Sequence, residues 1–153
     1  MRVIVGCVGK PRNRALADAI HDYETRAARY WPLEVFEVKE EPARSATADV
    51  VRRREGERLR KRVGSARVIA CAVDGKAMDS EQFAAWLQQE RENGQDIAFV
   101  IGGAYGLAPE VREQAIATFS LAKLTMPHEL ARLVLAEQLY RAGTLIRGEP
   151  YHK

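Results

Sequence analysis

Cysteine and histidine are scarce in this chain of 153 residues. There are two cysteines, Cys7 and Cys71, and three histidines, His21, His128 and His152. Both cysteines lie in apolar, strand-like runs, which is typical of buried free thiols in a reducing compartment and argues against a disulfide. The histidines show no metal-ligand spacing with either cysteine. We therefore expect neither a disulfide nor a metal site.

Long hydrophobic runs are absent too. No segment approaches the roughly 20 apolar residues that a membrane-spanning helix needs. The apolar run near the N-terminus, "VIVGCVG", ends at Lys10 and Pro11 and is too short for a signal peptide. These two absences predict a cytoplasmic protein without a membrane partner.

Repeats, low-complexity tracts and linker-like stretches are also lacking. A chain of this length is expected to form one domain around one core, so we predict a single domain over residues 1–153. The formal net charge of +3 permits a polyanionic partner without requiring one.

Short apolar runs alternate with segments of helical periodicity. The runs at residues 2–9, 33–38, 66–74 and 96–103 are rich in β-branched residues, and a fifth strand is expected to begin the stretch "TFSLAKLTMPHE". Asp79 and Gln82 have the spacing of a capping box at the start of a helix. Strands that alternate with helices predict an α/β fold, with a mainly parallel sheet flanked by helices.

The last helix is expected to begin near Thr125 or Pro127 and to be apolar almost all the way round. Its large apolar residues do not fall on one face: Leu130, Leu133, Val134, Leu135, Leu139, Tyr140 and Leu145. A helix of this kind must be covered on every side. The covering element is either a second subunit, which would make the protein a homodimer, or the rest of a monomer packed around a central helix.

Two loops are expected at the carboxyl ends of strands, where open α/β folds place their ligand sites. The first, "IGGAYGL", has paired glycines that let a ligand approach the backbone. Its G-G-x-x-G spacing is not the G-x-G-x-x-G of dinucleotide folds. That motif is also missing from the first strand and turn, "VIVGCVGK", which disfavours a nicotinamide-dependent enzyme. The second, "SLAKLTMPHE", offers mostly backbone groups in an apolar setting, which suits an adenine ring. Plain strand-to-helix connectors are the alternative.

Two further features carry polar side chains. Between Arg44 and Arg67 there are nine basic and three acidic residues, a pattern that favours a solvated helix face, with phosphate contact as the alternative. The chain ends in "GEPYHK", whose side chains can donate hydrogen bonds, although a disordered terminus is the ordinary expectation. Glu137 and Arg141 lie four residues apart and predict an ion pair on the last helix.

Four motifs in this order, "VIVGCVGK", "FVIGGAYGL", "LAKLTMPHELARLVLAEQLYRA" and "GEPYHK", resemble the RlmH family, the pseudouridine-N3 methyltransferases of bacterial 23S ribosomal RNA. The likeness covers the whole chain, and the tail and the last helix are its most specific parts. The resemblance implies a SPOUT methyltransferase: an α/β fold with a deep C-terminal trefoil knot, a homodimer, S-adenosylmethionine as cofactor, and 23S rRNA in the assembled ribosome as substrate.

The resemblance also implies a set of site residues. Those of the cofactor pocket are Cys71, Gly102, Gly103, Leu121, Ala122, Lys123, Leu124, Thr125 and Met126. The tail closes over the cofactor with help from the partner subunit, which puts Tyr151 and His152 on the substrate side.

The reaction needs a base for the N3 proton. His152, or a water that it holds, is the expected base, because its ordinary pKa is about 6.5, whereas the pKa of Tyr151 would have to fall from about 10. Arg141 is expected to stabilise the developing anion. A ribosome-associated RNA-binding protein without catalysis is the alternative function.

Overall fold

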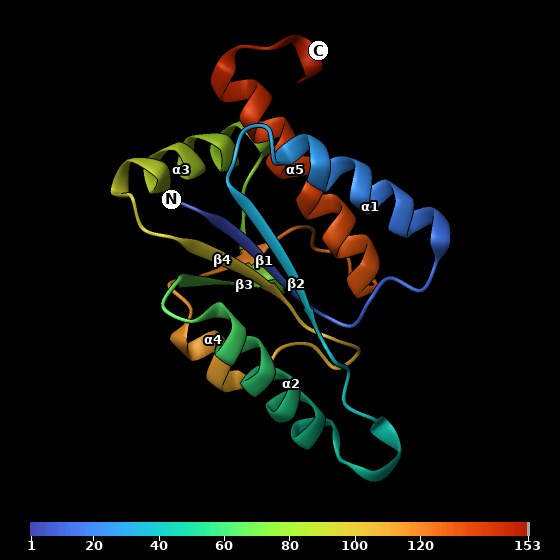
Figure 1. Ribbon diagram of the computed structural model, residues 1–153. Helices are drawn as coiled ribbons and strands as arrows, with labels where there is room; N and C mark the ends of the chain where they lie inside the picture. The colour runs from blue at the N-terminus through green and yellow to red at the C-terminus, as the bar shows by residue number, and fades with distance from the viewer. Residues whose placement is uncertain (153) are drawn as a thin grey trace.

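The chain folds into one parallel sheet between two layers of helices (Figure 1). The computed structural model describes residues 1–152, without the side chains of Ser45 and His152. In chain order the elements are β1 (Val3–Val8), α1 (Arg14–Ala27), β2 (Leu33–Val38), η1 (Ala43–Ser45), α2 (Ala48–Val63), β3 (Arg67–Ala77), α3 (Ser80–Asn93), β4 (Ile97–Ile101), α4 (Pro109–Gln114), β5 (Ala117–Ser120), α5 (His128–Arg147) and η2 (Pro150–His152).

The strand order in the sheet is β2-β1-β4-β3-β5, and every pair of neighbours is parallel. Helices α1, α3 and α5 cover one face, and α2 and α4 cover the other (Figure 1). The first face buries large side chains such as Phe83, Phe99 and Leu135. The predicted α/β fold is therefore confirmed.

The helix starts follow from local sequence. Asp79 accepts the backbone N–H of Gln82 at 2.7 Å, and the Gln82 side chain accepts the backbone N–H of Asp79 at 3.0 Å, so the predicted capping box is present. Pro109 stands at the first position of α4, where no backbone donor is needed. α5 begins at His128, close to the predicted start.

Strand β3 is longer than predicted, because it pairs with β5 twice. Cys71 and Lys76 are both partners of Phe119, with a register shift between them. Gly75 lies in this shifted segment, and a Cβ on it would come within 2.7 Å of the backbone of Thr118 and Phe119. Only glycine lets the two backbones approach so closely.

The apolar surface of α5 is largely covered within the single chain. Leu135 and Leu139 are fully buried, while Leu130, Leu133 and Val134 are half-buried. None of the large hydrophobic side chains of α5 is among the exposed ones. The all-round apolar pattern thus gives less support to a second subunit than the sequence suggested, and the homodimer and the trefoil knot stay predictions. No helix in residues 1–152 is long and apolar enough to cross a membrane.

Candidate active site

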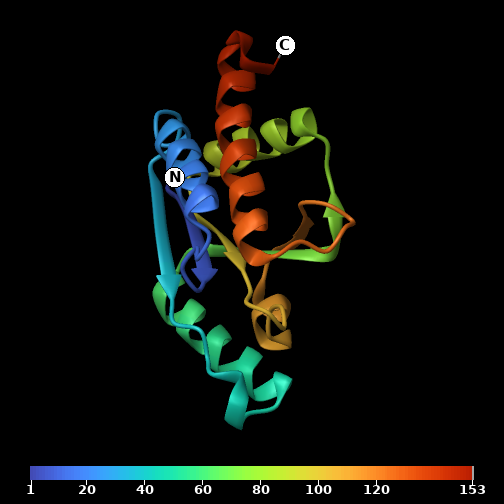
Figure 2. The ribbon, with the colours of Figure 1, turned by 90° about the vertical axis from the view of Figure 1, so that its right-hand side faces the viewer.

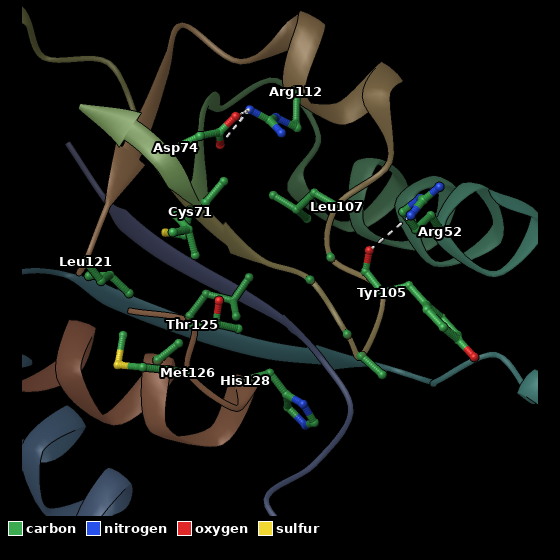
Figure 3. A pocket seen from close by; sticks show the side chains of 18 of the residues that line it. Arg52, Cys71, Asp74, Tyr105, Leu107, Arg112, Leu121, Thr125, Met126 and His128 are labelled. Atoms are coloured by element: carbon green, nitrogen blue, oxygen red, sulfur yellow. Dashed lines mark hydrogen bonds and ion pairs between the residues drawn. The ribbon is translucent and has the colours of Figure 1, made fainter. Parts of the chain in front are cut away.

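A pocket of about 690 Å³ opens where β3, β4 and β5 end (Figure 3). Its size is typical of a small-molecule site, and its place is the one at which open α/β sheets bind ligands. Its walls come from the end of β3, the glycine turn after β4, α4, the loop after β5 and the start of α5: Arg52, Cys71, Ala72, Val73, Asp74, Ile101, Gly102, Gly103, Ala104, Tyr105, Gly106, Leu107, Pro109, Arg112, Glu113, Leu121, Ala122, Leu124, Thr125, Met126, His128 and Ala131.

The glycine turn doubles back on itself. The carbonyl of Gly103 accepts the N–H of Gly106 at 3.0 Å, and Gly106 has φ +79°, a left-handed conformation that glycine adopts readily. A Cβ on Gly102 would stand 2.5 Å from the carbonyl carbon of Gly106. The turn itself therefore favours glycine at positions 102 and 106, and the glycines leave bare backbone facing the pocket.

Glu55 supports this turn from behind. It is buried on α2, and one carboxylate oxygen accepts the N–H of Glu41 at 3.1 Å, while Oε2 has no hydrogen-bond partner among the described residues. Burial raises the pKa of Glu55 above its ordinary value. A Cβ on Gly103 would lie 2.9 Å from Oε2. Replacing Gly103 would therefore disturb the core as well as the pocket, so it is not a clean test of ligand binding.

The loop after β5 forms the opposite wall. The buried hydroxyl of Ser120 donates to the carbonyl of Ala122 at 2.9 Å and fixes the start of this loop. Of the nine residues predicted for the cofactor pocket, eight line it; Lys123 is exposed and does not. Cys71 stands on the wall formed by β3, and burial raises its pKa, so it is a thiol and not a nucleophilic thiolate.

The pocket also contains polar groups that sequence reasoning missed. Arg112 donates to both carboxylate oxygens of Asp74 at 2.7 and 2.8 Å, and this pairing lowers the pKa of Asp74 (Figure 3). Arg52 donates to the carbonyl of Tyr105 at 3.4 Å. His128 carries a buried Nε2 that has no partner among the described residues. Asp74 lies at the carboxyl end of a predicted strand, and this position is the sequence signal that could have identified it as a pocket residue.

Two sets of contacts hold the start of α5 beside the pocket. Arg132 is buried and donates to Glu24 of α1 and Glu37 of β2, each at 2.7 Å. Glu129 accepts the backbone N–H groups of Arg12 and Asn13 at 2.9 and 3.4 Å. Because α5 is fixed to both α1 and the sheet, the pocket wall that it provides is rigid.

The tail packs on α5 and α1. The predicted ion pair is confirmed, since Arg141 donates to Glu137 at 2.6 Å. The hydroxyl of Tyr151 donates to the same carboxylate at 3.1 Å, its ring lies 4.5 Å from that of Tyr140, and Arg141 stacks over it at 4.9 Å. Burial and the hydrogen bond with Tyr23 raise the pKa of Tyr151, which opposes a role as base.

The tail follows the far end of α5 (Figure 2), whereas the pocket lies at the start of this helix. His128 lines the pocket, whereas Arg141 lies 13 residues further along the same helix. At 1.5 Å per residue, this separates them by about 20 Å. Arg141 and Tyr151 are therefore not brought to the pocket of their own chain. The side chain of His152 and all of Lys153 lie outside the described residues.

The basic run divides into two groups. Arg54 and Arg58 both pair with Glu41, and Arg62 stacks over Phe36 at 4.8 Å. By contrast, three residues of α2 are exposed and form no ion pair or hydrogen bond with the rest of the described chain: Arg53, Arg60 and Lys61. Their charges are free to contact phosphate.

Cys7 is buried, Cys71 is half-buried, and both are free thiols. Among the side chains that the structure describes, no group of three or more histidine, cysteine, aspartate or glutamate residues is placed to hold a metal ion.

A family model and a solved structure identify the class of protein to which this chain belongs. The family model described as "Predicted SPOUT methyltransferase" matches residues 1–152. A probable methylase family protein from Haemophilus influenzae shares the fold, with a TM-score of 0.56, 11% identity, and coverage of 99% of this chain and 70% of that one.

Proteins of similar sequence narrow this class to one family. The ribosomal RNA large subunit methyltransferase H of Gemmatimonas aurantiaca is 63% identical over the full length of both chains, and that of an Anaeromyxobacter species is 44% identical, again over both full lengths. This chain therefore belongs to the SPOUT methyltransferases and, within them, to the family of ribosomal RNA large subunit methyltransferase H, so the resemblance is confirmed.

Proposed function

We propose that this protein transfers a methyl group from S-adenosylmethionine to N3 of a pseudouridine in the 23S rRNA of the assembled ribosome. The observation that carries the proposal is the 63% identity, over the whole length of both chains, with a protein named for methylating large-subunit ribosomal RNA. The choice of pseudouridine N3 and of the assembled ribosome rests on the family resemblance.

The residues of the pocket fit S-adenosylmethionine. Its volume of about 690 Å³ suits a ligand of this size. The bare backbone of Gly102 and Gly103 on one side, and the loop from Leu121 to Met126 on the other, offer N–H and C=O groups for a flat adenine ring. When bound, the cofactor supplies an electrophilic methyl group on a sulfonium.

The chain's own residues handle the proton and the charge. N3 of the base must lose a proton as the methyl group arrives. Tyr151, whose pKa is raised, stays protonated and acts as a hydrogen-bond donor. His152 takes the proton, directly or through a water. Arg141 remains a cation and stabilises the anion that develops on the base.

A homodimer reconciles the position of the tail with this chemistry. The tail is about 20 Å from the pocket of its own chain along a helix that is fixed at both ends. We propose that each pocket is completed by Arg141, Tyr151 and His152 of the partner subunit. Sedimentation at micromolar concentration tests the dimer, and a monomer there would contradict a shared site.

Calorimetry with S-adenosylmethionine alone tests the pocket. Ala122→Trp places a large ring in the wall of the pocket, and we expect affinity to fall at least tenfold while the circular dichroism spectrum is retained. Ala43→Trp is the matched control, because Ala43 is exposed and does not line the pocket. Unchanged affinity in Ala122→Trp would refute the site.

The reaction is tested by methyl transfer from labelled S-adenosylmethionine to ribosomes that lack the modification, followed by mass mapping of the rRNA. We expect one methyl group on one pseudouridine. A protein that binds the particle but transfers no methyl group would instead be an RNA-binding protein without catalysis.

A further inference from the structure

Exposed large hydrophobic side chains gather at the rim of the pocket. Four large hydrophobic side chains are exposed among the described residues: Val73, Tyr105, Ile116 and Leu124. All except Ile116 line the pocket, and they come from three separate segments: β3, the glycine turn and the loop after β5. Exposed apolar groups that gather around a pocket mark an interaction surface.

Tyr105 differs from the other two because its backbone is held while its ring is free. It lies between Gly103 and Gly106, whose hydrogen bond closes the turn, and its carbonyl accepts from Arg52 at 3.4 Å. The side chain is 44% exposed, and within residues 1–152 the ring packs against no other aromatic ring. Figure 3 shows it directed away from Thr125 and Met126, toward the outside of the pocket.

Two arginines lie beside Tyr105, and the first of them, Arg52, also forms a surface ion pair with Asp49. Arg52 stands next to it on the rim, and Arg53 follows on the exposed face of α2. An aromatic ring flanked by arginine is the combination that binds unpaired nucleotides, since bases stack on the ring and phosphates pair with the cations. The core of a subunit interface is instead depleted of charge. The rim therefore fits RNA better than a second copy of this chain.

We propose that the ring of Tyr105 is a stacking platform for an unpaired base of the rRNA, beside the nucleotide that enters the pocket. Arg52 is a positioning residue: its guanidinium donates to the turn that carries the ring. The inference rests on the proposed function, because it requires ribosomal RNA at the mouth of this pocket.

The test measures the affinity of fluorescently labelled protein for purified large ribosomal subunits, with no methyl transfer involved. We expect Tyr105→Ala to weaken binding by about five- to 100-fold, as the loss of one stacked base does. Tyr105→Phe keeps the ring and should bind within about twofold of wild type. Tyr105→Leu keeps apolar surface without a ring and should bind as poorly as Tyr105→Ala.

Ile116→Ala is the matched control, because Ile116 is 45% exposed and does not line the pocket; its affinity should not change. The circular dichroism spectrum should be retained in all four variants, which shows that each of them is folded. Equal binding by Tyr105→Ala and wild type would overturn the inference. So would full binding by Tyr105→Leu, or a change in sedimentation that assigns Tyr105 to a subunit interface. If wild type fails to methylate ribosomes, the proposed function is refuted, but the comparison of ribosomal-subunit binding between the Tyr105 variants and wild type is unaffected.

Discussion

Replacing Arg132 should cost the fold several kcal/mol of stability, because Arg132 is a buried cation that joins three elements. Its side chain is 8% exposed and joins α5 to Glu24 and Glu37, whose side chains are 15% and 26% exposed. Arg132→Met keeps the length and the apolar stem but leaves both carboxylates without their cation. Breaking a buried ion pair from one side costs about 3–5 kcal/mol.

For a chain of this size, each kcal/mol lowers Tm by about 2–4 °C, so Arg132→Met should melt about 6–20 °C below wild type. Thermal unfolding followed by circular dichroism measures this. Arg2→Met is the matched control: Arg2 also pairs with two carboxylates, Glu34 and Asp96, but its side chain is 56% exposed. Surface pairs contribute about 0–1 kcal/mol, so its Tm should fall by no more than about 4 °C.

A triple variant identifies the cause. Adding Glu24→Gln and Glu37→Gln to Arg132→Met removes the uncompensated charges, and part of the lost Tm should return. If Arg132→Met has the same Tm as Arg2→Met, the buried ion-pair network does not stabilise the position of α5. If the triple variant is no more stable than Arg132→Met, the loss comes from packing and not from charge.

Three further predictions concern other parts of the chain. The pKa of Glu55 is raised in the fold, so the folded protein favours the neutral carboxyl group, and the stability that this group contributes is lost as pH rises through its raised pKa. Glu55→Gln should therefore raise Tm relative to wild type at pH 8 and raise it less at pH 4. Calorimetry at the two pH values measures this. Gly75→Ala forces a Cβ to within 2.7 Å of the β5 backbone, and denaturant unfolding should show a loss of about 1–3 kcal/mol, whereas an unchanged midpoint would mean that the strands can separate freely. Replacing Arg53, Arg60 and Lys61 together by Gln should weaken binding to ribosomal subunits and flatten its salt dependence, and an unchanged salt slope would leave α2 as a solvated face.

Local pattern was enough to predict the strands, the capping box and the two loops that wall the pocket. Each of these depends on residues close together in sequence, such as Asp79 with Gln82. The second pairing of β3 with β5 depends instead on a contact between Gly75 and Thr118, which no periodicity reveals. The predicted strand therefore ended too early.

The candidate site was predictable only in part, for the same reason. Gly102 and Gly103 line the pocket, as predicted from their place after a strand, but a Cβ on Gly103 would crowd Glu55, which lies 48 residues earlier in the chain. Arg52 reaches the rim because α2 packs behind the glycine turn. Its sequence neighbours Arg54 and Arg58 look the same in a charge count, yet they pair with Glu41. Arg52 is itself paired, with Asp49, so charge pattern does not show which of these arginines reaches the rim.

The length of α5 has a consequence for mixtures of subunits. Because the pocket and the tail stand at its two ends, a pocket variant such as Ala122→Trp and a tail deletion of residues 151–153 would impair different halves of each shared site. Each variant alone would be inactive in the proposed dimer. When the two are coexpressed, half of a random population of dimers would be mixed, and each mixed dimer would contain one site with both defects and one with neither. Two inactive proteins would then regain about a quarter of wild-type activity, a complementation that a site built within one chain cannot produce.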